Sequence, residues 1–162
     1  MAPRNPAAKG TQVVNDRVTP AEPSLLYVMK QVELAVRSRL DDMFRPLGLT
    51  ALQYTALTVL ERHPNLTSAQ LARSSFVTAQ TMADMVNTLQ ERGYLERHRD
   101  ADDRRRLVLS LTTQGRRLLG RSRGKVAALE AEMLAGLTKS QATELRRSLL
   151  ICRTALAAHP AS

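Results

Sequence analysis

Apolar residues recur at every third or fourth position along residues 24–48, the first patterned stretch of the chain. The recurring residues are Leu25, Met29, Val32, Val36, Leu40, Met43 and Leu47. This spacing puts them on one face and predicts a single long amphipathic helix. Pro46 and Gly48 are expected to end that helix. Residues 1–23 hold four prolines and no apolar period, so we expect a flexible N-terminal tail there.

Three later helix starts share the capping box T-x-x-Q, beginning at Thr50, Thr67 and Thr138. In this box the Thr hydroxyl accepts one backbone N–H, and the Gln side chain accepts the N–H of the cap residue itself. The boxes predict helices over residues 50–62, 67–74 and 138–157. His63 and Pro64 break the chain between the first two.

A fourth helix, a hairpin and a fifth helix occupy the centre of the chain. Thr78 suits the N-cap of a helix over residues 78–92 that ends at Gly93. Residues 94–98 and 106–111 are typical of short strands, and a polar loop joins them. In the second strand Leu107, Leu109 and Leu111 alternate with Val108 and Ser110, which predicts one buried face. A looser apolar stripe then predicts a helix from about residue 112 into the 130s.

The helices at 67–74 and 78–92, joined by three residues, have the layout of a helix-turn-helix. In that motif the N-terminal turns of the second helix lie in the DNA major groove. The outward residues at this position are Thr78, Gln80, Thr81 and Asp84. Gln can pair with adenine and Thr can contact the thymine methyl group. An ordinary packed helical hairpin would show the same polar face, so the helices alone leave both interpretations open.

Charge and the hairpin together favour nucleic acid. The net charge is +9, and residues 92–125 hold eleven Arg or Lys against four acidic residues. A concentrated basic segment is typical of nucleic-acid binding and less often of binding to anionic membranes, although a solvated surface fits as well. Arg104, Arg105 and Arg106 cannot be buried together without partners. At the tip of a wing they can reach the DNA minor groove, while Asp103 pairs with one of them and holds the loop. A mobile charged loop is the alternative.

Three motifs in this order resemble the MarR family of bacterial transcription regulators. The run L-G-L-T-A-L-Q-Y at 47–54 is similar to the family's entry into its second helix, and L-Q-E-R-G-Y-L at 89–95 to its junction between recognition helix and wing. The run D-R-R at 103–105, followed by L-T-T-Q-G at 111–115, is similar to its wing motif. The resemblance covers roughly residues 24–158. It implies that Arg105 enters the minor groove and that Asp103 is its partner in the wing.

The expected fold is mainly α with a small β-wing. A winged helix-turn-helix at 49–111 lies between an N-terminal dimerisation helix at 24–48 and C-terminal dimerisation helices at 112–158. The last helix supports this, because Leu145, Leu149, Cys152 and Leu156 are spaced like a seam for a partner helix. A homodimer of this kind should bind a pseudo-palindromic operator in double-stranded DNA, with half-sites about ten base pairs apart.

One departure from the family pattern concerns the recognition helix, which has no Lys or Arg before Arg92. Phosphate contacts are therefore expected from Arg99, Arg116 and Arg117, and from backbone N–H groups at helix N-termini. Asp84 can accept from cytosine N4 or point sideways to an arginine, and both remain open.

The resemblance also implies repression, and release of the operator by a small aromatic or anionic effector bound between the dimer helices and the winged domain. Met43, Phe44 and His63 lie near that junction, although core packing explains them equally well.

Several classes of protein are disfavoured. The single cysteine permits no intramolecular disulfide and fits a reducing cytoplasm. The N-terminal residues hold no apolar run of signal-peptide length, and no stretch approaches the length of a membrane span, so we expect neither feature. The three histidines lie in different elements, without catalytic or metal-ligand spacing. We therefore expect a cytoplasmic protein that is no enzyme and needs no metal or cofactor. A sequence-neutral architectural DNA-binding protein is the main alternative, and a purely protein-binding helical dimer is a weaker one.

Overall fold

The computed structural model describes residues 21–157, and this part of the chain forms six α-helices, one short 3-10 helix and one hairpin. In chain order they are α1 (Leu25–Phe44), η1 (Arg45–Leu47), α2 (Ala51–Arg62), α3 (Ser68–Ser74), α4 (Ala79–Glu91), β1 (Leu95–Arg99), β2 (Leu107–Leu111), α5 (Thr113–Leu134) and α6 (Lys139–Ala157). The fold class predicted from the sequence is confirmed, and each predicted element is present with bounds that differ by a few residues at most. The tail predicted for residues 1–23 lies almost entirely outside the described residues.

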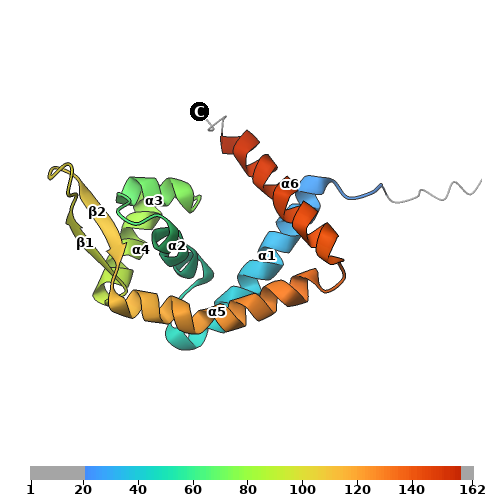
Figure 1. Ribbon diagram of the computed structural model, residues 1–162, viewed down its shortest axis with the longest axis horizontal. Coiled ribbons are helices and arrows are strands. Elements are labelled where there is room, and N and C mark those ends of the chain that lie inside the picture. The colour runs from blue at the N-terminus through green and yellow to red at the C-terminus, as the bar shows by residue number, and fades with distance from the viewer. Residues whose placement is uncertain (1–20, 158–162) are drawn as a thin grey trace, which may run out of the picture.

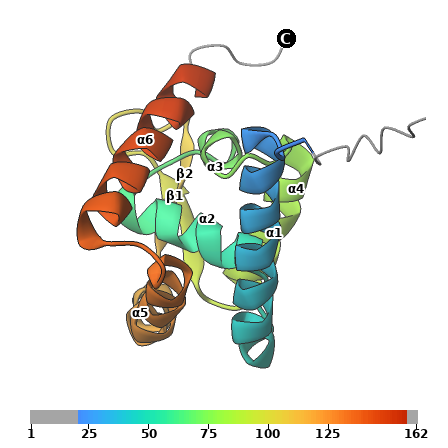
Figure 2. The same ribbon diagram turned by 90° about the vertical axis from the view of Figure 1, so that its right-hand side faces the viewer.

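The molecule has two ends, and α5 runs between them. The hairpin gathers with α2, α3 and α4 at one end, whereas α1 and α6 extend at the other (Figure 1). The turned view shows α1 and α6 standing apart from one another (Figure 2). None of the helices within residues 21–157 is long and apolar enough to cross a membrane.

The hydrophobic core lies in the unit formed by α2, α3, α4 and the hairpin. Its fully buried side chains include Leu57, Leu60, Leu71, Met82, Val86, Leu89, Leu95 and Leu109. Of the long helices, α5 adds Leu118 and Leu119 to this core, whereas α1 and α6 add little. Phe44, stacked on Tyr54 with ring centroids 4.2 Å apart, is the one buried residue of α1, and α6 has no buried residue. Packing therefore stabilises the winged unit, whereas α1 and α6 keep their apolar faces uncovered within the protomer.

The predicted caps account for where the helices begin. Both bonds of the capping box are present at Thr50, at Thr67 and at Thr138. Thr78 and Thr112 cap α4 and α5 through their hydroxyl groups. These caps satisfy backbone N–H groups that the first helical turn leaves without partners.

The predicted alternation in the second strand is wrong. β1 and β2 pair antiparallel, from Leu95 opposite Leu111 to Arg99 opposite Leu107. Leu109 and Leu111 are buried as expected, but Val108 on the opposite face is also buried and Leu107 is half exposed. Leu107 lies beside the loop at the tip of the hairpin, beyond the core, and has little to pack against.

The end of the hairpin and the start of α5 approach so closely that a glycine is required at position 115. The Thr112 hydroxyl donates to the carbonyl oxygen of Gly93 at 2.5 Å. The backbone N–H of Thr112 donates to the carbonyl oxygen of Tyr94 at 3.2 Å. A Cβ built on Gly115 would lie 2.1 Å from the Tyr94 carbonyl oxygen. This contact is with backbone, which cannot swing aside as a side chain would.

We predict that Gly115→Ala lowers the free energy of unfolding by about 1–3 kcal/mol, because the added methyl group must push α5 away from β1. Gly120→Ala is the matched control in the same helix, since a Cβ at Gly120 meets nothing within 4 Å. It should raise stability by roughly 0.5–1 kcal/mol through helix propensity. Urea denaturation followed by circular dichroism measures both. Equal effects of the two substitutions would contradict the close approach.

Candidate nucleic-acid interface

The α3–α4 pair divides its residues sharply between a buried face and an exposed face. α4 buries Met82, Met85, Val86 and Leu89 against the core. The four residues predicted to face outward, Thr78, Gln80, Thr81 and Asp84, are all exposed. The structure therefore presents the N-terminal half of α4 to solvent along one polar strip.

Hydrogen bonds along this strip position its side chains. The Thr78 hydroxyl accepts the backbone N–H of Thr81 at 3.1 Å and donates to the Thr81 hydroxyl at 2.9 Å. The Gln80 amide donates to the Asp84 carboxylate at 3.1 Å. Asp84 thus pairs with a neighbour one helical turn away, so among the described residues its recorded partner is a glutamine and not an arginine.

The wing loop, residues 100–106, is organised by two aspartates. Asp100 accepts the backbone N–H groups of Asp102 at 2.8 Å and of Asp103 at 3.3 Å. Asp103 accepts the backbone N–H of Arg105 at 3.0 Å and forms an ion pair with its Nε at 3.4 Å. The two backbone hydrogen bonds that Asp100 accepts lower its pKa, and the bond from Asp102 contributes most. The nearby positive charge of Arg106 lowers this pKa by less. The expected pairing of Asp103 with Arg105 is present.

Arg105 is almost fully accessible at this tip. Its side chain is 94% exposed, and the ion pair with Asp103 holds only the Nε side of the guanidinium. Its two terminal nitrogens therefore keep four N–H donors available for an external acceptor. Arg104 and Arg106 are also exposed. Arg106 differs from its neighbours, because it donates to Gln70 of α3 at 3.3 Å and lies 3.9 Å from Asp100.

Two contacts that the sequence did not reveal tie the hairpin to the helices. Arg97 of β1 donates to the Asn87 side chain of α4 at 2.8 Å, and Arg106 reaches Gln70. Their pairing depends on how the hairpin folds back on α3 and α4, and sequence spacing carries no signal for it. The hairpin is therefore connected to α3 and α4 by side chains as well as by the chain.

The three arginines predicted to contact phosphate are exposed, but Arg99 lies apart from the other two. Arg99 is near the tip of the hairpin and donates to the Arg104 carbonyl oxygen at 3.3 Å. Arg116 and Arg117 are adjacent in the first turns of α5, at the base of the hairpin, and Arg116 donates to the Leu111 carbonyl oxygen at 2.8 Å. The structure therefore places these charges at both ends of the hairpin.

The three residues suggested for an effector differ in their exposure. Phe44 is buried beneath Tyr54, Met43 is half buried, and His63 is exposed at the end of α2. Neither of the two pockets described in residues 21–157 is lined by any of them.

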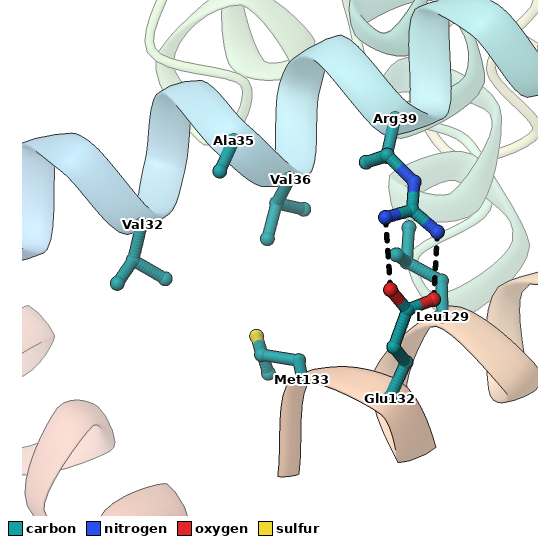
Figure 3. A pocket seen from close by; sticks show the side chains of 7 residues that line it. All are labelled: Val32, Ala35, Val36, Arg39, Leu129, Glu132 and Met133. Atoms are coloured by element: carbon teal, nitrogen blue, oxygen red, sulfur yellow. Dashed lines mark hydrogen bonds and ion pairs between the residues drawn. The ribbon is translucent and has the colours of Figure 1, made fainter. Parts of the chain in front are cut away.

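A pocket of about 230 Å³ lies elsewhere, between α1 and α5. Its apolar wall consists of Val32, Ala35, Val36, Leu129 and Met133, and Arg39 and Glu132 close one end (Figure 3). Two hydrogen bonds, of 2.9 and 2.6 Å, join this pair. Arg39 lowers the pKa of Glu132, so the carboxylate is ionised at neutral pH.

Among the described residues, no group of three or more His, Cys, Asp or Glu side chains is placed to hold a metal ion. The aspartates of the exposed strip on α4 and of the wing loop that have recorded partners are Asp84, Asp100 and Asp103, each in a hydrogen bond or ion pair.

The fold and the exposed strip beside an arginine-bearing hairpin define a winged helix-turn-helix protein. A family model described as MarR family matches residues 47–106. The chain is 35% identical over 123 residues to the HTH-type transcriptional repressor Rv2887 of Mycobacterium tuberculosis, with 76% of this chain and 88% of the relative aligned. The protein belongs to the MarR family.

Solved structures agree with this assignment. The structure of Rv2887 from M. tuberculosis in complex with DNA matches with a TM-score of 0.67 at 33% identity, covering 81% of this chain and 98% of that one. The same protein in complex with salicylic acid also matches with a TM-score of 0.67 at 33% identity, covering 82% and 98%. Nearly all of these two solved chains is thus aligned with the present one.

We predict that the wing loop loses its organisation in acid. Because its hydrogen bonds lower the folded-state pKa of Asp100 below the unfolded value of about 3.9, they stabilise the loop fully above that value. This stabilisation is lost as the pH falls through the folded pKa. The amide resonances of Asp102 and Asp103 should titrate with a midpoint below the ordinary Asp value. Asp100→Asn should remove this transition, and a midpoint at or above about 3.9 would contradict the assignment.

Proposed function

We propose that the protein is a sequence-specific repressor of transcription, which binds a pseudo-palindromic operator in double-stranded DNA as a homodimer in the cytoplasm. It acts by binding alone, without a catalytic step or a cofactor. The observation that carries the proposal is the exposed polar strip of α4 held beside an arginine-bearing hairpin. The DNA complex of Rv2887 supports the same use of the fold.

The strip on α4 has the chemistry for reading bases in the major groove. Gln80 uses one amide N–H on Asp84 and keeps the other, together with its carbonyl oxygen. These two groups suit the N7 and N6 positions of adenine. Asp84 retains lone pairs that can accept from cytosine N4, while Thr81 offers a methyl group to thymine. The hydrogen bond from Gln80 fixes the direction of the Asp84 carboxylate. The negative charge of Asp84 near DNA therefore contributes to the selection of bases.

The wing supplies the positive charge that α4 lacks. Arg105 extends from a loop fixed by Asp100 and Asp103, and its terminal nitrogens are accessible. Such an arginine fits the minor groove, where the negative potential is strongest over narrow A·T-rich segments. Arg99 at the end of β1 and the pair Arg116 and Arg117 in the first turns of α5 suit the phosphates on either side, while Arg104 and Arg106 add charge at the tip.

The uncovered apolar faces of α1 and α6 support a homodimer. Exposed large apolar side chains on these helices include Leu25, Leu26, Val32, Leu145, Leu149, Leu150, Ile151 and Leu156. An isolated helix is marginally stable in water, and most helical stability in proteins comes from packing an apolar face. A helix of 19 residues without a buried residue, as α6 is in the protomer, therefore requires a partner. A second copy supplies the same surfaces by two-fold symmetry.

We also propose release of the operator by a small aromatic or anionic molecule. The salicylic acid complex of Rv2887 supports this class of ligand. In this chain the pocket between α1 and α5 suits it better than Met43, Phe44 and His63 do, because apolar side chains line it and the Arg39 guanidinium lies at one end. An anion there would compete with Glu132 for Arg39 and would shift α5 relative to α1.

The first test selects binding sites from a random DNA pool and titrates the winner and a scrambled copy at two salt concentrations. We expect a pseudo-palindrome of roughly 16–20 base pairs, bound at least ~10³-fold more tightly than its scramble by a protein that sediments as a dimer. Equal, steeply salt-dependent binding to both DNAs would indicate an architectural protein instead. Binding to neither DNA would contradict the proposed DNA-binding function.

Arg105→Ala should weaken binding to the selected operator by about 1–3 kcal/mol and leave the folded dimer intact. The expected reason is the loss of a minor-groove guanidinium. Arg45→Ala is the matched control, because it removes another exposed arginine whose ion pair with Asp42 is local to the end of α1. Fluorescence anisotropy measures both, with the melting temperature as a check on folding. Operator binding by Arg105→Ala at the wild-type level would refute the minor-groove assignment.

A further inference from the structure

The same C-terminal turn ends three helical segments, and one of the three has the wrong residue for it. In this turn, the Schellman motif, the residue after the cap adopts the left-handed conformation, and glycine is strongly preferred there. Gly48 after η1 and Gly93 after α4 follow the rule, with φ of 64° and 73°. After α3 the position is occupied by Phe76, with φ of 56°. The N–H of Phe76 donates to the carbonyl oxygen of Arg73, and that of Val77 to the carbonyl oxygen of Ala72, which completes the motif.

Phe76 makes this turn less stable than a glycine at the same position would. A bulky residue in the left-handed region is a steric outlier, whereas glycine pays no such penalty. Burial of the ring does not compensate, because Phe76 is 85% exposed. The neighbouring Ser75 adds a second cost, since its buried hydroxyl has no hydrogen-bond partner among the described residues. A local conflict of this kind is expected at functional positions.

The exposed ring does not belong to the surface that we assign to the dimer. Apart from Phe76 and Leu107, every exposed large apolar side chain in the described chain lies within residues 25–47 or 133–156. Phe76 lies in the turn of the helix-turn-helix instead. It precedes Thr78, the N-cap of α4, by two residues, a stretch of chain that spans at most about 7 Å. Phe76 is therefore an exposed aromatic residue close to the first turn of the helix whose exposed strip faces DNA in the proposed function.

We propose that the Phe76 ring packs on DNA, against the apolar C–H surface of a deoxyribose or of a thymine methyl group at the edge of the major groove. The inference rests on the proposed DNA-binding function and adds a contact that the strip on α4 and the wing do not supply. Phenylalanine is suited to thymine methyl contacts, and sugar contacts fix the register of a protein on the duplex. The contact also fits a recognition helix without Lys or Arg in its first turns, because apolar burial replaces part of the missing charge attraction.

Three substitutions separate the ring from the backbone conformation. Phe76→Gly removes both the ring and the left-handed penalty, Phe76→Ala removes the ring but keeps a Cβ, and Phe76→Tyr keeps an aromatic ring. Each variant is titrated with the duplex selected from the random pool, alongside the wild type and Arg105→Ala, and its melting temperature is recorded without DNA.

Phe76→Gly and Phe76→Ala should each bind the operator about tenfold more weakly, since both lose the buried ring surface. Phe76→Tyr should bind within about threefold of wild type, because it retains most of that surface. Phe76→Gly alone should melt about 2–4 °C higher, since only glycine relieves the backbone. The salt dependence of binding should not change in any Phe76 variant, because no phosphate contact is lost.

Two outcomes overturn the proposal. If Phe76→Gly binds the operator as tightly as wild type while the wild type still discriminates against the scramble, the ring does not contact DNA. If Phe76→Gly melts lower than wild type, the ring is packed within the protein. Failure of the proposed function is distinguishable from both, because the wild type would then not discriminate between the two duplexes.

Replacing thymine by uracil across the half-site distinguishes the two apolar surfaces. If the ring contacts a thymine methyl group, the uracil duplex should weaken binding by the wild type more than binding by Phe76→Gly, which keeps only the proposed contact from Thr81. If the ring contacts deoxyribose, the penalty of the uracil duplex should be equal for the two proteins.

Discussion

The carbonyl oxygen of Tyr94 occupies the space beside Gly115 that a side chain would need, and the arrangement of the molecule depends on this approach. Four segments meet there: the end of α4, the first residue of β1, the last residue of β2 and the first turn of α5. The Thr112 hydroxyl and N–H fix the junction by donating to Gly93 and Tyr94. Because α5 leaves this point for the far end of the molecule, the direction of α5 and the pose of the hairpin are set together.

A second set of hydrogen bonds connects the end of α4 to the junction between α1 and α2. The Arg92 guanidinium, at the end of α4, donates to the carbonyl oxygens of Leu47 and Gly48, where α1 gives way to α2. Asp41 of α1 also accepts the first N–H of α2, that of Ala51, at 2.6 Å. The winged unit is thereby joined to α1 at one point and to α5 at another. A change in the angle between α1 and α5, as proposed for ligand binding near Arg39, would reach α4 through both.

The sequence predicted most of this fold because the decisive signals are local. Each helix start depends on a cap and a residue three positions later, and the motifs at 47–54, 89–95 and 111–115 mark the junctions just described.

The features that the sequence could not predict depend on contacts between segments. The burial of Val108 and the exposure of Leu107 follow from where the core ends, which strand periodicity does not reveal. The partners of Arg97 and Arg106 lie in helices far along the chain. The exposed residues of α4 and of the wing were predicted correctly as exposed polar positions. The hydrogen bond from Gln80 to Asp84 was not predicted, because an arginine was an equally plausible partner for Asp84.

The wing loop obtains its shape almost entirely from its own residues. Asp100 and Asp103 accept from backbone N–H groups two or three positions away, and the recorded contact of the loop with a helix is the one from Arg106 to Gln70. α4 is instead shaped by the core beneath it. The two parts of the surface can therefore change independently in evolution. Substitutions on the exposed strip can alter which bases are preferred while the loop keeps its conformation, and loop substitutions can alter the preferred groove shape without repacking the core. A lineage of such proteins could thus acquire new binding sites in small steps, each leaving a folded and partly competent regulator.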